Sequence, residues 1–121
     1  MTDHFFLIGR ILIGIYFLLP GIAKIFLFSV NLDIVILKEV PFPALSLSIV
    51  AAAQIILGSF IIVGKHLKTS SIGLVVTTLL INFYIHDFWN LNGDPNQAHE
   101  VQNFVKNLGI LAGLLILSKE K

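Results

Sequence analysis

Four long apolar stretches constrain this chain more than any other feature of its sequence. They cover about residues 5–28, 44–63, 70–88 and 99–117. Each is close to or above the ~20 residues that an α-helix needs to cross a lipid bilayer. Only 12% of the 121 residues are charged, against about 25% in an average soluble domain. The chain therefore has too few charged side chains to cover a surface in water, and lipid is the solvent that fits it.

These stretches predict an all-α integral membrane protein, a four-helix bundle that forms a single domain over residues 1–121. Short connections favour antiparallel neighbours, so we expect an up-down-up-down order. No small-x-small cleavage site follows the first stretch, which is expected to remain as a helix. The connector after it contains Pro41 and Pro43 and is not expected to be a regular helix. Its apolar part, 32–37, is too short to cross and either lies in the interface or dips back toward the bundle.

The lysine and arginine residues near the helix ends predict the orientation of the bundle. One side, which holds both termini, carries Arg10, Lys65, Lys68, Lys119 and Lys121, and the other carries Lys24, Lys38 and Lys106. This bias predicts cytoplasmic termini. Most of the acidic residues then face outward, to the periplasm in a bacterium.

Small, polar and charged residues share one face on three of the predicted helices. They are Arg10, Gly14, Phe17, Gly21 and Lys24 in the first helix, Ala51, Gln54 and Gly58 in the second, and Gln102, Lys106, Gly109 and Gly113 in the fourth. Such faces are typical of packing seams, and Gly109 with Gly113 forms a GxxxG pair that lets another backbone approach closely. Arg10 could instead extend its charge to the membrane interface.

A second polar group is expected at the outer ends of the third and fourth helices. It comprises His86, Asp87, Trp89, His99, Glu100, Asn103 and Lys106. Asn82, His86 and Trp89 follow helical spacing on one face. A histidine, lysines and an aromatic wall could bind an anion or a polar quinone headgroup. The alternative is that the aromatic residues lie at the interface and the charges pair at a helix end.

Other kinds of site are not expected. His86, Asp87 and His99 lack the spacing of a metal site, so no metal is expected. A formal net charge of +1 gives no basic surface for nucleic acid. The chain has no cysteine and shows no haem-ligand motif or nucleotide loop, so electron transfer would need a quinone or a partner protein.

The segment 10–24 resembles the opening helix of the DoxX family. That family's pattern is an arginine, a glycine four residues later, an aromatic residue and then glycine-x-x-lysine, which Arg10, Gly14, Phe17, Gly21 and Lys24 match. The segments 86–89, 104–108 and 113–115 look like the family's closing helices. The resemblance covers essentially the whole chain and implies a multi-pass protein of the bacterial inner membrane.

The resemblance implies a membrane anchor or quinone-facing subunit of a redox system of the thiosulfate or oxidative-stress type, at most an oxidoreductase subunit. The candidate cavity residues are Arg10, Lys24, Gln54, Asn82, His86, Trp89, Lys106 and Asn107, and the helix-packing glycines are Gly14, Gly21, Gly58, Gly109 and Gly113. Relatives often carry a glutamate where this chain has Gln54, and a glutamine cannot relay a proton.

The expected partners are the lipid bilayer, a soluble redox protein and further copies of the chain. Quinone is the candidate cofactor, and no covalently bound group is expected. Two alternatives remain open from the sequence. One is a transporter or permease for a small solute or anion, and the other is a structural membrane partner without catalysis.

Overall fold

The chain folds into helices joined by short connections. The structure, a computed structural model, describes residues 3–121 and contains α1 (His4–Phe26), α2 (Phe28–Leu37), α3 (Pro43–Val63), α4 (Leu67–Tyr84), the 3-10 helix η1 (Phe88–Asn90) and α5 (Gln97–Leu117). Within this part of the chain, 4 helical segments are long and apolar enough to cross a membrane. The predicted all-α four-helix membrane bundle is thereby confirmed; residues 1 and 2 of the predicted domain lie outside the described part.

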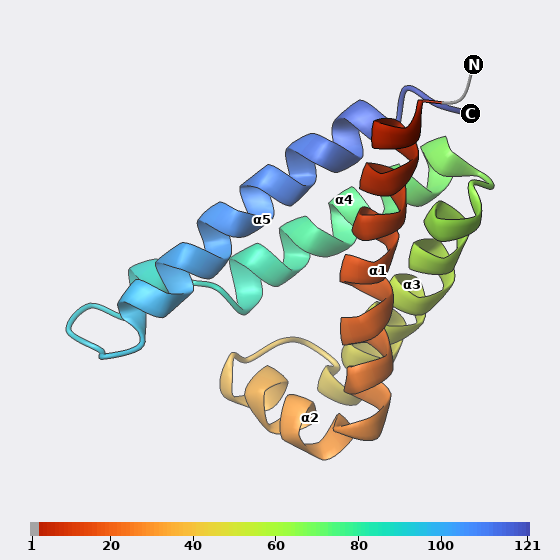
Figure 1. The fold of residues 1–121 in the computed structure, drawn as a ribbon. Coiled ribbons are helices and arrows are strands. Elements are labelled where there is room, and N and C mark those ends of the chain that lie inside the picture. Colours follow the sequence, from red (N-terminus) through yellow and green to blue (C-terminus); the bar gives the residue numbers. More distant parts are fainter. Residues whose placement is uncertain (1–2) are drawn as a thin grey trace.

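The long helices form two antiparallel pairs. α1 packs along α3 in the most extensive contact of the molecule, and α4 packs along α5 (Figure 1). The pairs meet where both termini lie, at what we call the termini end, and diverge toward the opposite end, the α2 end (Figure 1). At the termini end the backbone amide of Leu67 donates a hydrogen bond of 3.3 Å to the carbonyl of Lys121.

Glycines hold α1 and α3 close together. A Cβ atom at Gly14 would lie 2.8 Å from the carbonyl oxygen of Gly58, and one at Gly21 would lie 3.0 Å from the Cβ of Gln54. Side chains at these positions would separate the two backbones, which explains why the shared face of α1 carries glycines.

The connector between the first two spans differs from the sequence prediction. It contains a helix, α2, which begins directly after a break at Leu27 and ends before the two prolines. Pro41 lies in the loop after α2 and Pro43 is the first residue of α3, where its missing amide hydrogen is not needed, so neither proline prevents the helix before them. At 10 residues, α2 is about 15 Å long and too short to cross a bilayer. It runs across the α2 end with Val35 buried (Figure 1).

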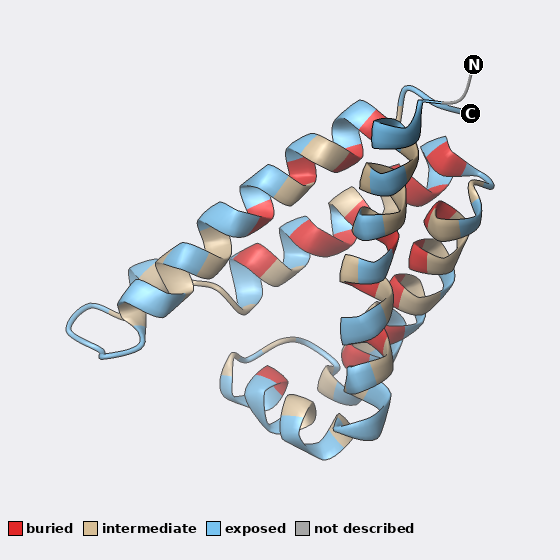
Figure 2. Cartoon of the chain, viewed as in Figure 1, coloured by how far each residue is buried: buried red, intermediate tan, exposed pale blue. Residues whose placement is uncertain are grey.

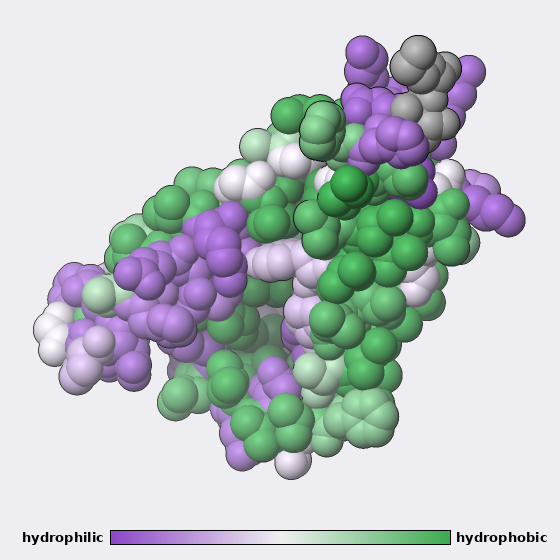
Figure 3. Space-filling view, viewed as in Figure 1, coloured by the Kyte–Doolittle hydropathy of each residue, from purple (hydrophilic) through white to green (hydrophobic). Residues whose placement is uncertain are grey.

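Burial and hydropathy follow the membrane pattern. The buried residues lie mainly on the helix faces that are turned toward other helices (Figure 2). Large apolar side chains cover much of the outside, among them Phe5 at 88% exposure and Ile116 at 74%. Hydrophilic residues gather at the termini end, over the loop before α5 and its first turns, and around a hollow between the helix pairs (Figure 3). The outer surface therefore suits lipid, and the polar groups away from the ends lie between the helices.

Candidate functional site

Two adjoining chambers occupy the space between the helix pairs near the α2 end. The larger one, the apolar chamber, has a volume of about 450 Å³. The smaller one, the polar chamber, has a volume of about 230 Å³. Both are lined by Lys24, Ile81 and His86, so they meet at these three residues.

The apolar chamber lies between α2, the start of α3 and the end of α4. Most of its lining is apolar: Ile34, Val35, Val40, Pro41, Leu47, Val50, Leu80, Ile81 and Ile85. Its few polar groups include Asn31, Ser46 and Tyr84, besides Lys24 and His86. A chamber of this composition accepts a hydrocarbon group and offers polar contacts mainly where it meets its neighbour.

All four long helices contribute to the polar chamber. Its lining comprises Tyr16, Phe17, Pro20, Lys24, Gln54, Thr78, Ile81, His86, Lys106 and Asn107. The Nζ of Lys24 donates a hydrogen bond of 2.9 Å to Oε1 of Gln54. The Nζ of Lys106 lies 5.7 Å from the centre of the Tyr16 ring, within the range of a cation–π contact. Two ammonium groups therefore approach one small chamber from α1 and α5.

A chain of buried hydrogen bonds fixes the inner wall of the polar chamber. The hydroxyl of Tyr16 donates to Oδ1 of Asn107 at 2.7 Å, and Nδ2 of Asn107 donates to Oδ1 of Asn82 at 2.9 Å. Nδ2 of Asn82 donates in turn to the carbonyl of Phe104 at 3.3 Å. This chain connects α1, α5 and α4. Because buried amides are costly to leave unpaired, it ties α1 to the other helix pair at a defined register.

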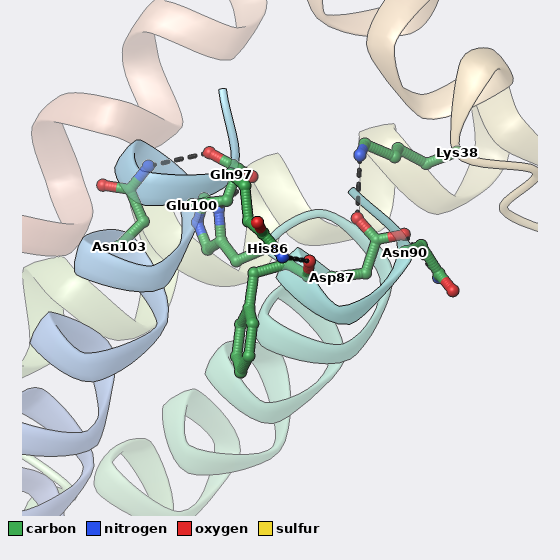
Figure 4. A network of polar contacts seen from close by, with 8 residues as sticks. Lys38, His86, Asp87, Asn90, Gln97, Glu100 and Asn103 are labelled. Carbon is green, nitrogen blue, oxygen red and sulfur yellow. Dashed lines mark hydrogen bonds and ion pairs between the residues drawn. The ribbon is translucent and has the colours of Figure 1, made fainter. Parts of the chain in front are cut away.

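His86 stands at the junction of the chambers and is held by α5. Its Nδ1 lies 3.0 Å from Oε2 of Glu100, whose Oε1 accepts a hydrogen bond of 3.0 Å from Nδ2 of Asn103 (Figure 4). An ionised carboxylate only accepts hydrogen bonds, so the pairing places a proton on Nδ1 and leaves Nε2 for another partner. Glu100 thus fixes both the orientation and the tautomer of His86.

A second ion pair connects α2 to the end of α4. The Nζ of Lys38 lies 2.7 Å from Oδ1 of Asp87, and Nδ2 of Asn90 donates to Oδ2 of Asp87 at 2.9 Å (Figure 4). Both charged side chains are largely shielded, with exposures of 17% and 14%. The pair bridges the two helix pairs at the α2 end, beside the apolar chamber.

The predicted cavity residues divide into two groups. Lys24, Gln54, His86, Lys106 and Asn107 line the polar chamber, and Asn82 supports it through Asn107. Arg10 and Trp89 line neither chamber. Arg10 lies near the termini end, where its guanidinium donates a hydrogen bond of 3.1 Å to the carbonyl of Ile62. Trp89 is 42% exposed and packs against Phe83, Phe88 and Phe104.

The predicted packing glycines also divide. Gly14, Gly21 and Gly58 lie in the seam between α1 and α3. A Cβ at Gly113 would make an ordinary contact with Ile13, whereas one at Gly109 would meet no described atom within 4 Å. Gly109 therefore leaves room on α5 that no other helix of this chain fills.

Sequence reasoning missed Tyr16, Pro20 and Thr78 as lining residues. A signal for them exists, since Tyr16, Pro20 and Lys24 recur at intervals of four, as do Thr78, Asn82 and His86. Among residues 3–121, no group of three or more His, Cys, Asp or Glu residues is placed to hold a metal ion.

Comparison with known proteins found a match to one family model. The family model described as DoxX matches residues 5–87, which run from α1 to the junction after α4. No curated protein and no solved structure matched the chain in the corresponding searches.

Proposed function

Since the chain belongs to the DoxX family of membrane proteins, we propose that it is the membrane subunit of a redox system and that it binds a quinone between its helix pairs. The observation that carries the proposal is the junction at Lys24 and His86. There a polar chamber with hydrogen-bond donors opens beside a larger apolar one.

The apolar chamber fits the hydrocarbon part of such a ligand. A membrane quinone has a flat headgroup with two carbonyl oxygens and a long apolar tail. At about 450 Å³ the chamber lies within the range of pockets that hold small molecules. It is bounded by membrane helices on one side and by α2 on the other.

The junction fits the headgroup. An ammonium group has three hydrogens to donate, and the described contacts of Lys24 use one of them, for Gln54. The remaining hydrogens can bind a carbonyl oxygen. His86 offers its Nε2, which accepts a hydrogen bond when the ring is neutral and donates one when it is protonated. The two residues can therefore hold either the oxidised or the reduced form of the headgroup.

The role assigned to this chain is to bind and orient the quinone. With no cysteine in the sequence, thiol chemistry has to come from elsewhere. A soluble oxidoreductase that docks on the chain would supply the electrons, and Lys24 and His86 would fix the position of the carbonyl oxygens.

Binding of a quinone analogue to the purified protein in detergent tests the proposal. We expect saturable binding that weakens about tenfold or more in His86→Ala, because a hydrogen bond to a polar headgroup is lost. The matched control is His99→Ala, since His99 is exposed on α5 and lines neither chamber. Thermal unfolding of each variant shows that it is folded. No saturable binding, or equal binding by wild type and His86→Ala, would overturn the proposal.

A further inference from the structure

The polar chamber holds more positive charge than its own contacts account for. Within residues 3–121, neither Lys24 nor Lys106 forms an ion pair, since the described ion pairs are Lys38 with Asp87 and His86 with Glu100. Lys24, which is half-buried, gives one hydrogen bond to Gln54, and Lys106, an exposed residue of α5, contacts the face of Tyr16. A charged group between membrane helices, as that of Lys24 is, is costly, and such a group is usually paired or faces a ligand or water.

Thr78, in the wall of the same chamber, carries a buried hydroxyl without a partner in the described part of the chain. The residue is 2% exposed, and its Oγ1 has no hydrogen-bond partner among the described residues. A buried hydroxyl that is left unpaired costs free energy, so rotation of the Thr78 side chain toward an occupant of the chamber would stabilise it. The two ammonium groups can only donate hydrogen bonds, and the hydroxyl can donate one as well as accept, which points to an occupant rich in acceptors and negatively charged.

The chamber also lies at a level that suits a lipid headgroup. Lys24 precedes the end of α1 by two residues. Lys106 follows the polar first turns of α5, which carry Gln97, His99, Glu100, Gln102 and Asn103. Both ammonium groups are therefore expected near the boundary of the hydrocarbon core, where lipid phosphates lie. The hollow between the helix pairs leaves space for acyl chains (Figure 3).

We propose that the polar chamber binds the phosphate group of an anionic membrane lipid, held by Lys24, Lys106 and Thr78. This site goes beyond quinone binding and does not depend on it. Lys106 lines the polar chamber but not the apolar one, so it separates the two ligands experimentally.

Lipid titration followed by native mass spectrometry tests the site. The protein in neutral detergent is titrated with phosphatidylglycerol and, in parallel, with zwitterionic phosphatidylcholine. We expect wild type to bind the first phosphatidylglycerol about tenfold more tightly than phosphatidylcholine, since each charge-assisted hydrogen bond changes affinity by about this factor. Lys106→Gln should abolish the preference and Lys106→Arg should retain it. The control Lys119→Gln, an exposed residue at the termini end, should bind as wild type does.

Three results would overturn the proposal. The first is equal affinity of wild type for the two lipids, and the second is a preference that persists in Lys106→Gln. The third is displacement of phosphatidylglycerol by inorganic phosphate at a similar concentration, which would assign the chamber to a free anion.

The quinone analogue distinguishes this proposal from the previous one. If Lys106→Gln loses the lipid preference and still binds the quinone analogue, Lys106 serves the lipid alone and the two sites share Lys24 only, as proposed. If it loses quinone binding and keeps the lipid preference, the polar chamber belongs to the quinone headgroup and the lipid assignment is wrong. Failure of quinone binding in wild type, with the lipid preference intact, would leave this inference standing alone.

Discussion

The presence or absence of one Cβ atom determines how closely two helices of this protein can approach each other. Gly14 and Gly109 lie on the packing faces that the sequence predicts for α1 and α5, yet their surroundings are opposite. A Cβ on Gly14 would come within 2.8 Å of a backbone oxygen and would also collide with Ile62, whereas a Cβ on Gly109 would meet open space. Backbone atoms cannot move aside as a flexible side chain can, so the two positions should respond differently to the same methyl group.

Gly14→Ala should therefore lower the free energy of unfolding by about 1–3 kcal/mol, because α1 and α3 must separate to admit the methyl group. Gly109→Ala should leave it unchanged or raise it by up to about 1 kcal/mol, since alanine favours a helix over glycine. Denaturant unfolding in detergent micelles measures both. Equal effects of the two substitutions would contradict the packing described for α1 and α3.

Asn107 forms hydrogen bonds to both Tyr16 and Asn82, so its substitution gives a second prediction for a single residue. Asn107→Leu should cost about 1–2 kcal/mol by leaving two buried polar groups unpaired. Adding Asn82→Leu should cost less than the sum of the two single changes, because the groups are coupled. Gln102→Leu, at an exposed position on the same helix, is the control. Strict additivity of Asn82→Leu and Asn107→Leu would argue against the hydrogen-bond chain.

At the scale of elements, α2 is the part that helical periodicity describes least well. It packs on α1 and α3 but reaches the other helix pair through the ion pair of Lys38 and Asp87. The loop that follows it contains Glu39 and Phe42 with φ angles of 59° and 48°, which non-glycine residues adopt rarely. The ion pair of Lys38 and Asp87 therefore connects the C-terminal end of α2 to the segment after α4, beside the apolar chamber.

Lys38→Met should loosen α2 without unfolding the bundle. The loss of about 1 kcal/mol from a partly shielded ion pair should speed amide hydrogen exchange in residues 28–37 about fivefold. Exchange in α1 and α3 should be unchanged. The same substitution at Lys65, which is exposed at the termini end, should have no effect on α2. Unchanged exchange in Lys38→Met would show that the ion pair does not hold α2.

For the whole molecule, the apolar runs predict much of the fold, because lipid requires long helices whose backbone bonds are satisfied internally. Helical spacing also groups Arg10 with Lys24 on one face of α1. It does not show that the two residues lie at different levels along the helix axis. Fourteen residues of helix separate them by about 21 Å, so Arg10 lies far from the chambers. Trp89 was placed by extending the spacing of α4, and that helix ends at Tyr84. The divergence of the helix pairs depends on contacts between helices, which spacing within one helix does not contain.

Orientation is a prediction that the structure leaves to experiment, and the absence of cysteine makes it simple to test. Lys119→Cys should react with a membrane-impermeant thiol reagent only after a bacterial expression host is permeabilised, because the charge bias places the termini in the cytoplasm. Asn92→Cys, in the exposed loop before α5, should react in intact cells. The reverse pattern would invert the topology and place the chambers near the cytoplasmic side.

Site mapping with a photoactivatable quinone analogue in membranes tests most directly whether a quinone binds between the two helix pairs. We expect cross-links to residues of both α3 and α4 that line the apolar chamber, and we expect excess unlabelled quinone to suppress them. Cross-links confined to outward residues such as Phe5 and Ile116, or labelling that excess quinone does not reduce, would contradict the account.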